Sequence, residues 1–319
     1  MTILVATSVV RGSRQGESHG GVYLIDLTNK RVVQPIDWNN AGIDWQGRGW
    51  DRGLRGIAFD GGRVFIAASD ELFVCDRLFR KVASYRSPYL RHCHEISTCQ
   101  RRLYLTSTGF DSLLGFDLDR NRFVWGLHIR HGNGAYQGTP FDPAAGGGPA
   151  PGNALHLNSV YCHERGMYLS GLRTGGLLKF DGRHIVMVAT LPTGTHNARP
   201  HRDGILFNDS QADAVRFESP TRQMAFAVPH FDPATLTHTD LDDSRIARQG
   251  FGRGLCLVDD RLIAAGSSPS TITLHDLDSG KSTSMVNLSL DIRNAIHGLE
   301  VWPHAEPVGA APGRDCGTD

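Results

Sequence analysis

The chain has 319 residues, in which 33 lysines and arginines balance 33 aspartates and glutamates. This balance leaves no overall charge to attract nucleic acid or an anionic membrane, so we expect neither as a partner. No stretch approaches the ~20 apolar residues of a membrane-spanning helix, and the amino-terminal MTILVATSVV lacks the flanks of a secretion signal, which predicts a cytoplasmic protein. The six cysteines form no CxxC pair and are predicted to be reduced and structural.

A two-strand pattern repeats along the chain with a period of about 40 residues. Each copy has a polar residue, a short β-type run, a turn, and a second apolar run that ends in a small hydroxylated residue. The copies are Arg55–Ser69, His94–Ser107, His156–Ser170, Asn197–Ser210 and Arg253–Ser267. Two further short strands follow each copy, as ELFVCD and KVASYR do in the first unit. Hairpins repeated in this way, with no helical periodicity, are typical of β-propeller blades.

The two ends of the chain predict how the ring closes. ILVATS, GGVYLIDL and RVVQPI near the amino terminus have the pattern of second, third and fourth strands, and IHGLEVW at Ile296–Trp302 has that of a first strand. Together they complete a sixth blade. We therefore predict an all-β, six-bladed propeller with four antiparallel strands per blade, as a single domain over residues 1–302. Residues 303–319 are predicted to be a disordered tail.

Three connectors are much longer than the others, at residues 37–54, 130–154 and 231–251. Each joins the fourth strand of one blade to the first strand of the next, so we expect all three to emerge on one face of the propeller. Long loops gathered on one face of a rigid scaffold commonly shape a binding site. The three tryptophans of the first connector could pack under it or form an aromatic wall for a ligand, and we expect packing.

The residue that opens the innermost strand of each blade should point towards the axis at this face. Read around the ring, these residues are Arg55, His94 followed by Glu95, His156 with Asn158, His196 with Asn197, Arg253, and His297. Imidazoles that converge from rigid strands are typical ligands of Fe, Mn, Zn or Cu. We therefore hypothesise an enzyme in which the four histidines hold one divalent metal, with Fe favoured.

In this hypothesis the metal acts as Lewis acid or O₂ activator, which favours an oxidoreductase or a lyase over a hydrolase. Glu95 would be a general base or would orient a histidine ligand. Arg55 and Arg253 would anchor a small polar or anionic substrate. His92 and His201 are alternatives to His94 and His196, because strand alternation lets one member of each pair face the axis.

Two other interpretations stay open. Glu95 with Asn158, Asn208 and Asp209 would make an all-oxygen site, which suits Ca²⁺ better than a transition metal. The same mouth could also bind a peptide or metabolite without catalysis, because a propeller fold does not determine a function.

Two motifs carry a family resemblance, LNSVYC at 157–162 and ARPHRDGILFNDS at 198–210. They resemble six-bladed propellers of the gluconolactonase, senescence-marker and strictosidine-synthase group, over about residues 1–302. The lactonase-like members hold Ca²⁺ through Glu, Asn, Asn and Asp. The resemblance implies these roles for Glu95, Asn158 and Asn208 or Asp209, in a Ca²⁺-dependent lactonase or esterase.

The segments HLNS, HNARPHRDG and FGRGL are also similar to a bacterial family of uncharacterised propellers, which implies a fold and no activity. The ring of histidines is similar in arrangement to that of the carotenoid-cleaving oxygenases, whose iron has four histidine ligands. Those enzymes have seven blades, and the similarity does not extend beyond the arrangement.

Overall fold

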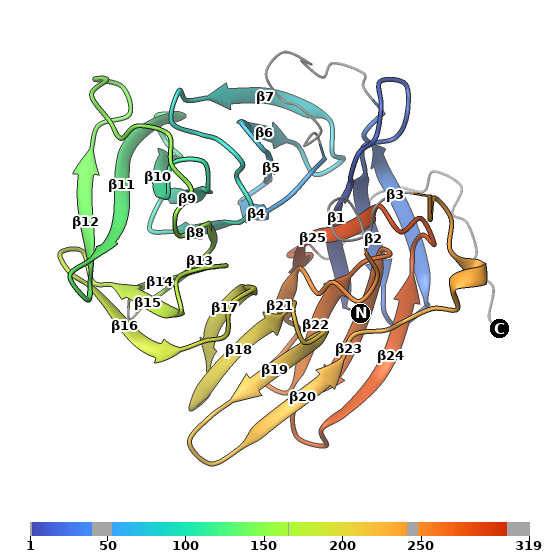
Figure 1. The fold of residues 1–319 in the computed structure, drawn as a ribbon. Coiled ribbons are helices and arrows are strands. Elements are labelled where there is room, and N and C mark those ends of the chain that lie inside the picture. The colour runs from blue at the N-terminus through green and yellow to red at the C-terminus, as the bar shows by residue number, and fades with distance from the viewer. Residues whose placement is uncertain (1, 40–52, 165, 241–247, 305–319) are drawn as a thin grey trace.

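The computed structural model describes residues 2–39, 53–164, 166–240 and 248–304. These residues form six antiparallel sheets around a central axis, five of them four-stranded and one five-stranded (Figure 1). The predicted six-bladed propeller is confirmed. The one helical element of the described residues is a short 3₁₀ turn, η1 (Pro233–Thr235). No helix in the described part of the chain has the length and apolar character needed to cross a membrane.

The blades follow one another in chain order, and each is built from its innermost strand outwards. The first has β4 (Ile57–Asp60), β5 (Arg63–Ala68), β6 (Glu71–Cys75) and β7 (Lys81–Arg86); the second has β8 (Ile96–Cys99), β9 (Arg102–Ser107), β10 (Ser112–Asp117), β11 (Arg122–Gly132) and β12 (Ala135–Phe141). The third has β13 (Leu157–His163), β14 (Gly166–Gly171), β15 (Gly176–Phe180) and β16 (Ile185–Thr190); the fourth has β17 (Thr195–His201), β18 (Gly204–Asp209), β19 (Ala214–Glu218) and β20 (Gln223–Ala227). The fifth has β21 (Leu255–Leu257), β22 (Leu262–Ser267), β23 (Thr271–Asp276) and β24 (Lys281–Asn287); the sixth has β25 (Asn294–Val301), β1 (Ile3–Val10), β2 (Gly21–Asp26) and β3 (Arg31–Asp37).

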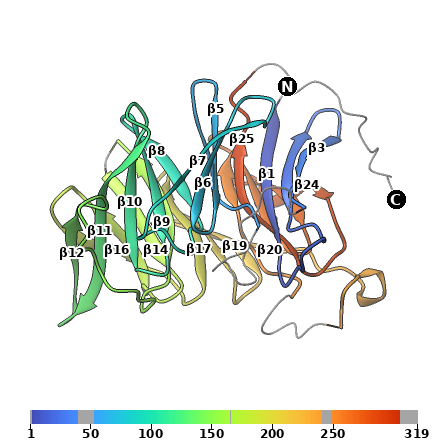
Figure 2. The same cartoon turned by 90° about the horizontal axis from the view of Figure 1, so that it is seen from above.

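The sixth blade closes the ring with strands from both ends of the chain, as predicted. β25 pairs antiparallel with β1, from Leu4 opposite Val301 to Val10 opposite Asn294. The two strands lie side by side in both Figure 1 and Figure 2. Trp302 then stacks on Phe79 of the first blade, with ring centroids 5.3 Å apart. Blades six and one are therefore joined by apolar packing as well as by the backbone.

The second long connector is not the loop that its length predicts. Residues 122–132 form a long β11 and residues 135–141 form β12, a fifth strand at the outer edge of the second blade. The turn between them is Asn133–Gly134, and both residues have positive φ, at 53° and 75°. This is the conformation of a tight two-residue hairpin, for which Asn-Gly is the preferred sequence. The hairpin signal is therefore present in the sequence, inside a segment whose length points to a loop.

The other two connectors lie partly outside the described residues, which exclude 40–52 and 241–247. Of the three tryptophans, Trp38 is described, and its ring centroid lies 5.0 Å from that of Phe73 in the first blade. Trp38 therefore packs, as expected. Trp45 and Trp50 lie outside the described residues, and so do residues 305–319 of the predicted tail.

Candidate functional site

The four histidines that open the innermost strands come together on the propeller axis. The ring centroid of His94 lies 5.5 Å from that of His156 and 6.2 Å from that of His297. His196 is close enough to lower the pKa of His94, and His156 is close enough to lower the pKa of His196. We call these four residues the axial histidines. Their equivalence around the ring, inferred from the repeats, predicted this cluster.

The tautomer of His94 follows from its hydrogen bonds. Its Nδ1 atom lies 2.7 Å from the carbonyl oxygen of His92 and 3.0 Å from Oγ1 of Thr108. A carbonyl oxygen can only accept, so Nδ1 carries the proton and donates it. The Thr108 hydroxyl itself donates to the carbonyl of Leu157 at 2.6 Å, so its oxygen is also an acceptor for His94. The Nε2 atom of neutral His94 therefore carries the lone pair.

The same arrangement recurs at His196, two blades further on. Its Nδ1 atom lies 3.0 Å from the carbonyl oxygen of Gly194 and 2.9 Å from Oγ of Ser210. The Ser210 hydroxyl donates to the carbonyl of Gly252 at 2.8 Å, as Thr108 does to Leu157. Nε2 of His196 again carries the lone pair, and it is buried with no hydrogen-bond partner among the described residues.

Arg253 connects the fifth and sixth blades at the axis. Its Nη1 atom lies 3.3 Å from Nε2 of His297, and because a guanidinium only donates, this Nε2 is also an acceptor. The guanidinium of Arg253 also lies over the ring of Phe251, 4.6 Å from its centroid. The Phe251 ring in turn contacts His196, at a centroid distance of 5.5 Å. Arg253 therefore lies between His297, to which it donates, and the ring of Phe251, which contacts His196.

Burial and positive charge keep the axial histidines neutral. Burial is the largest cause that lowers the pKa of each of them, and it brings the pKa of His156 to about 4. The charge of Arg253 also lowers the pKa of all four, and Arg55 contributes at His94, His156 and His297. The axis at this face therefore combines neutral imidazoles with a positive potential, which favours an anionic ligand.

Glu95 does not join the axial histidines. Its Oε1 atom accepts hydrogen bonds from Nδ2 of Asn197 at 3.1 Å and from Nη2 of Arg199 at 3.4 Å. Its Oε2 atom is buried without a partner among the described residues. Glu95, Arg199 and Glu300 line a cavity on the axis beyond the histidines. Arg199 and Glu300 lie further along the innermost strands than the opening positions that the repeats identify, which is why sequence analysis missed them.

Among the oxygen ligands that the resemblance implied, Asn158 and Asn208 each have a buried oxygen without a partner in the described part of the chain, as Glu95 does. Oδ1 of Asn158 and Oδ1 of Asn208 are buried without a hydrogen-bond partner among the described residues, as Oε2 of Glu95 is. Asp209 differs, because its Oδ2 atom pairs with Nε of Arg216 at 2.8 Å. Between the two alternatives, Asn208 is therefore the better candidate for an ion ligand.

Of the two alternative histidines, His201 lies away from the axial site, whereas His92 is close enough to His156 to lower its pKa. His201 is at the far end of β17, where its Nε2 atom lies 3.0 Å from the carbonyl oxygen of Asp260. This residue supports a turn rather than the axial site, which leaves His196 as the member of that pair on the axis. His92 is partly buried in a left-handed backbone conformation, with φ of 53°, and its carbonyl orients His94.

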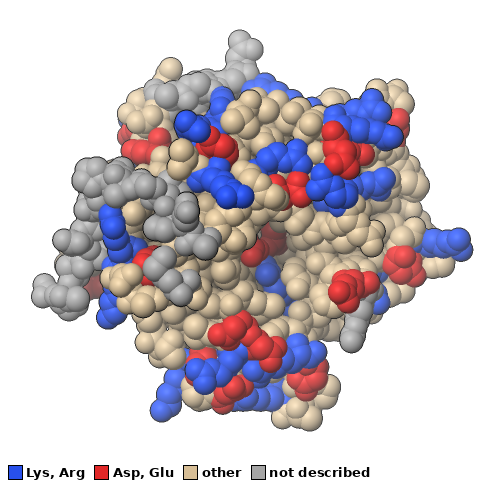
Figure 3. All heavy atoms as spheres, turned by 180° about the vertical axis from the view of Figure 1, so that it is seen from behind, with Lys and Arg blue, Asp and Glu red and all other residues tan. Residues whose placement is uncertain are grey.

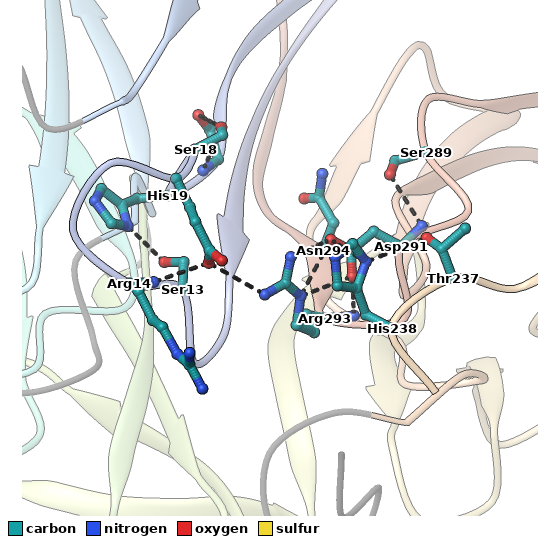
Figure 4. Close-up of polar contacts among 12 residues, drawn as sticks. Ser13, Arg14, Ser18, His19, Thr237, His238, Ser289, Asp291, Arg293 and Asn294 are labelled. Atoms are coloured by element: carbon teal, nitrogen blue, oxygen red, sulfur yellow. Dashed lines mark hydrogen bonds and ion pairs between the residues drawn. The ribbon is translucent and has the colours of Figure 1, made fainter. Parts of the chain in front are cut away.

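A network of polar side chains ties the loops at the rim of the sixth blade (Figure 4). Arg293 makes ion pairs with Asp291 at 2.8 Å and with Glu17 at 3.3 Å, and His238 lies 3.3 Å from Asp291. These groups satisfy one another and join the loop after β1 to the loop before β25. We assign them to the closure of the ring.

The fold and the site define a β-propeller that carries neutral histidines and positively charged arginines on its axis. No family model and no curated protein sequence matches the chain. Among solved structures, the chain is similar to a protein of unknown function from Bacteroides caccae, with 10% identity, 95% of this chain and 99% of that chain covered, and a TM-score of 0.55.

A chain of the nidogen/laminin complex is also similar, with 11% identity, 94% of this chain and 97% of that chain covered, and a TM-score of 0.53. A streptogramin B lyase matches with 12% identity, 74% of this chain and 69% of that chain, at a TM-score of 0.47. At these identities the first two likenesses show the fold alone. The resemblance to the gluconolactonase group stays a prediction.

Proposed function

We propose that this protein is an enzyme that acts on a small anionic molecule at the axial histidines, with a divalent metal ion, Fe favoured over Mn, Zn or Cu. The observation that carries the proposal is the arrangement shared by His94 and His196. In each, Nδ1 donates to a backbone carbonyl and to a hydroxyl, which leaves the Nε2 lone pair as the reactive position. Histidine ligands of metals are typically oriented in this way by their second nitrogen.

Three of the four axial histidines are suited to bind a metal ion, and His297 is the exception. Three axial histidines, His94, His156 and His196, would hold the ion, because they are neutral and two of them have a defined Nε2 lone pair. His297 is less suited, since Arg253 already donates to its Nε2. In the described part of the chain no group of three or more His, Cys, Asp or Glu is already spaced to hold an ion. Small side-chain movements at the axis would therefore accompany binding.

The two arginines favour a substrate that carries an anionic group. A divalent cation close to Arg253 and Arg55 meets like charges, which an anionic group between them would offset. A guanidinium can bind a carboxylate or phosphate through two parallel hydrogen bonds. Arg253 would thus hold the anionic group of the substrate against the axial histidines, with Phe251 as the wall behind it. When bound, the metal would supply Lewis-acid or O₂ chemistry to that substrate.

Elemental analysis of untagged protein purified without chelator tests this proposal. We expect near-stoichiometric iron, or else manganese, zinc or copper, in the wild type. The metal should be lost in His196→Ala and retained in the control His184→Ala, whose side chain is 76% exposed in an outer turn. No transition metal in the wild type, or equal content in the two variants, would contradict the proposal.

The unpartnered oxygens favour calcium as a second candidate, for a Ca²⁺-dependent lactonase or esterase. Buried acceptors without partners, such as those of Glu95, Asn158 and Asn208, are costly unless an ion or water satisfies them. Carboxylate and amide oxygens are the ligands that Ca²⁺ prefers. Stoichiometric calcium that persists in His196→Ala and disappears in Asn158→Ala would favour this candidate over the first.

A further inference from the structure

A second cavity lies on the propeller axis at the end opposite to the axial histidines. It has a volume of about 290 Å³ and receives residues from all six blades. Its walls are Ile57, Ala58, Phe59, Glu95, Ile96, Ser97, Thr98, Val160, Tyr161, Arg199, Leu257 and Glu300. We call it the rear cavity. Figure 3 shows the face opposite to that of Figure 1, where the centre is hollowed and acidic and basic side chains line the hollow.

The rear cavity is separate from the histidine site. Glu300 lies three residues after His297 on β25, and a strand rises about 3.3 Å per residue, which places it roughly 10 Å further along the axis. Val160, Arg199 and Leu257 likewise lie beyond the openings of their innermost strands, whereas Glu95 directly follows His94. None of the axial histidines is among the described residues that line the rear cavity.

The charged groups of the rear cavity are two carboxylates and one guanidinium. The side chain of Arg199 is only 6% exposed, and it makes an ion pair with Oε1 of Glu95 at 3.4 Å. Its guanidinium also lies over the ring of Tyr161, 5.0 Å from the centroid. Arg199 is thus held by Glu95 and Tyr161, and its single charge cannot neutralise both carboxylates when Glu300 is ionised.

We propose that the rear cavity binds a small organic ammonium ion with a short apolar body. The ammonium group donates to Glu95, whose Oε2 atom lacks a partner among the described residues, and to Glu300, and it supplies the positive charge that the two carboxylates need beyond Arg199. The apolar body lies against the side chains of Ile57, Ile96 and Leu257. The volume equals that of about ten water molecules in the liquid, which is enough for a short alkyl chain.

The protonation of Glu300 supports this ligand. Burial raises the pKa of Glu300 to about 7, with a smaller contribution from Glu95, while Arg199 acts in the opposite direction. The strand β1 that pairs with β25 has no titratable side chain, and the nearby thiol of Cys256 stays protonated because burial raises its pKa. Glu300 therefore becomes an anion as the pH rises through 7, and affinity for an ammonium ion should rise with it.

Calorimetric titration with n-butylammonium tests the proposal, with n-butanol as the neutral control ligand. At pH 8 we expect saturable binding of the ammonium ion and none of the alcohol. Glu300→Gln should weaken binding at least tenfold and abolish its dependence on pH between 6 and 8. The matched control is Glu164→Gln, an exposed glutamate in the β13–β14 turn, which should bind as the wild type does.

Titration of the wild-type protein alone can contradict the proposal. Absence of saturable n-butylammonium binding at pH 8, equal affinity for the alcohol, or affinity that does not rise with pH would each do so. Equal affinity in wild type and in a folded Glu300→Gln variant would also contradict it. His196→Ala should bind the ammonium ion normally, so this test and the transition-metal analysis can fail independently. Glu95 is shared with the calcium candidate alone.

Discussion

Lowering the pH from 7.5 to 5.5 is expected to reduce the free energy of unfolding of the metal-free protein by about 4 kcal/mol. The four axial histidines have folded pKa values below their ordinary value of 6.5. Below pH 6.5 the unfolded chain therefore binds more protons than the folded chain, and stability falls with the pH. Each of these histidines contributes ~1.3 kcal/mol over this window, and the four together contribute about 5 kcal/mol. His275, whose pKa burial lowers to about 4, contributes about 1 kcal/mol more.

Glu300 has the opposite effect and offsets part of this loss. Its folded pKa is raised to about 7, so the folded chain takes up a proton that the unfolded chain does not, which stabilises the fold by about 2 kcal/mol as the pH falls. Urea unfolding at the two pH values measures the net change. His196→Gln should reduce the difference by about 1 kcal/mol, whereas the exposed His184→Gln should not change it. A stability that is equal at both pH values would mean that the axial histidines are not held neutral.

Gly298→Ala is expected to lower the free energy of unfolding by about 3 kcal/mol, because the new methyl group has no space. A Cβ atom at this position would lie 2.4 Å from the carbonyl oxygen of Arg55 and 2.6 Å from Oγ1 of Thr7. The amide of Gly298 also donates to Thr7 Oγ1 at 2.8 Å, and this hydroxyl donates to the Arg55 carbonyl. The substitution would therefore push apart the sixth and first blades where the ring closes.

Thermal or urea unfolding of Gly298→Ala measures this effect, and Gly132→Ala is the matched control. A Cβ atom at Gly132 would have no atom within 4 Å, so this variant should differ from the wild type by less than about 0.5 kcal/mol. Equal stability of the two variants would contradict the close approach of β25 to the first blade.

The fold was predictable because two independent features of the sequence agree. The repeated hairpins define the blades, and the unmatched strands at the two ends fit together as β25 with β1 to β3. β12 was missed because its Asn133–Gly134 turn lies within a segment longer than the other connectors. A local turn signal inside a long connector can therefore indicate a strand on each side of it.

The site was predictable only at the start of each innermost strand. Equivalent positions in the repeats identified the axial histidines, and the small hydroxylated residue that ends each repeat included Ser210, which orients His196. Beyond that point the register shifts between His196 and Arg199, and strand alternation no longer gives the direction of a side chain. Asn197 also has a left-handed backbone, with φ of 55°, which no pattern of apolar and polar residues reveals.

His94 and His196 are neutral and carry their lone pairs on Nε2. Long-range ¹H–¹⁵N correlation spectra of the histidine rings measure this directly, with His94→Gln and His196→Gln used to assign the signals. At pH 6 in metal-free protein we expect both rings as Nδ1–H tautomers with unprotonated Nε2. Imidazolium forms, or Nε2–H tautomers, at either residue would contradict this arrangement of the axial histidines.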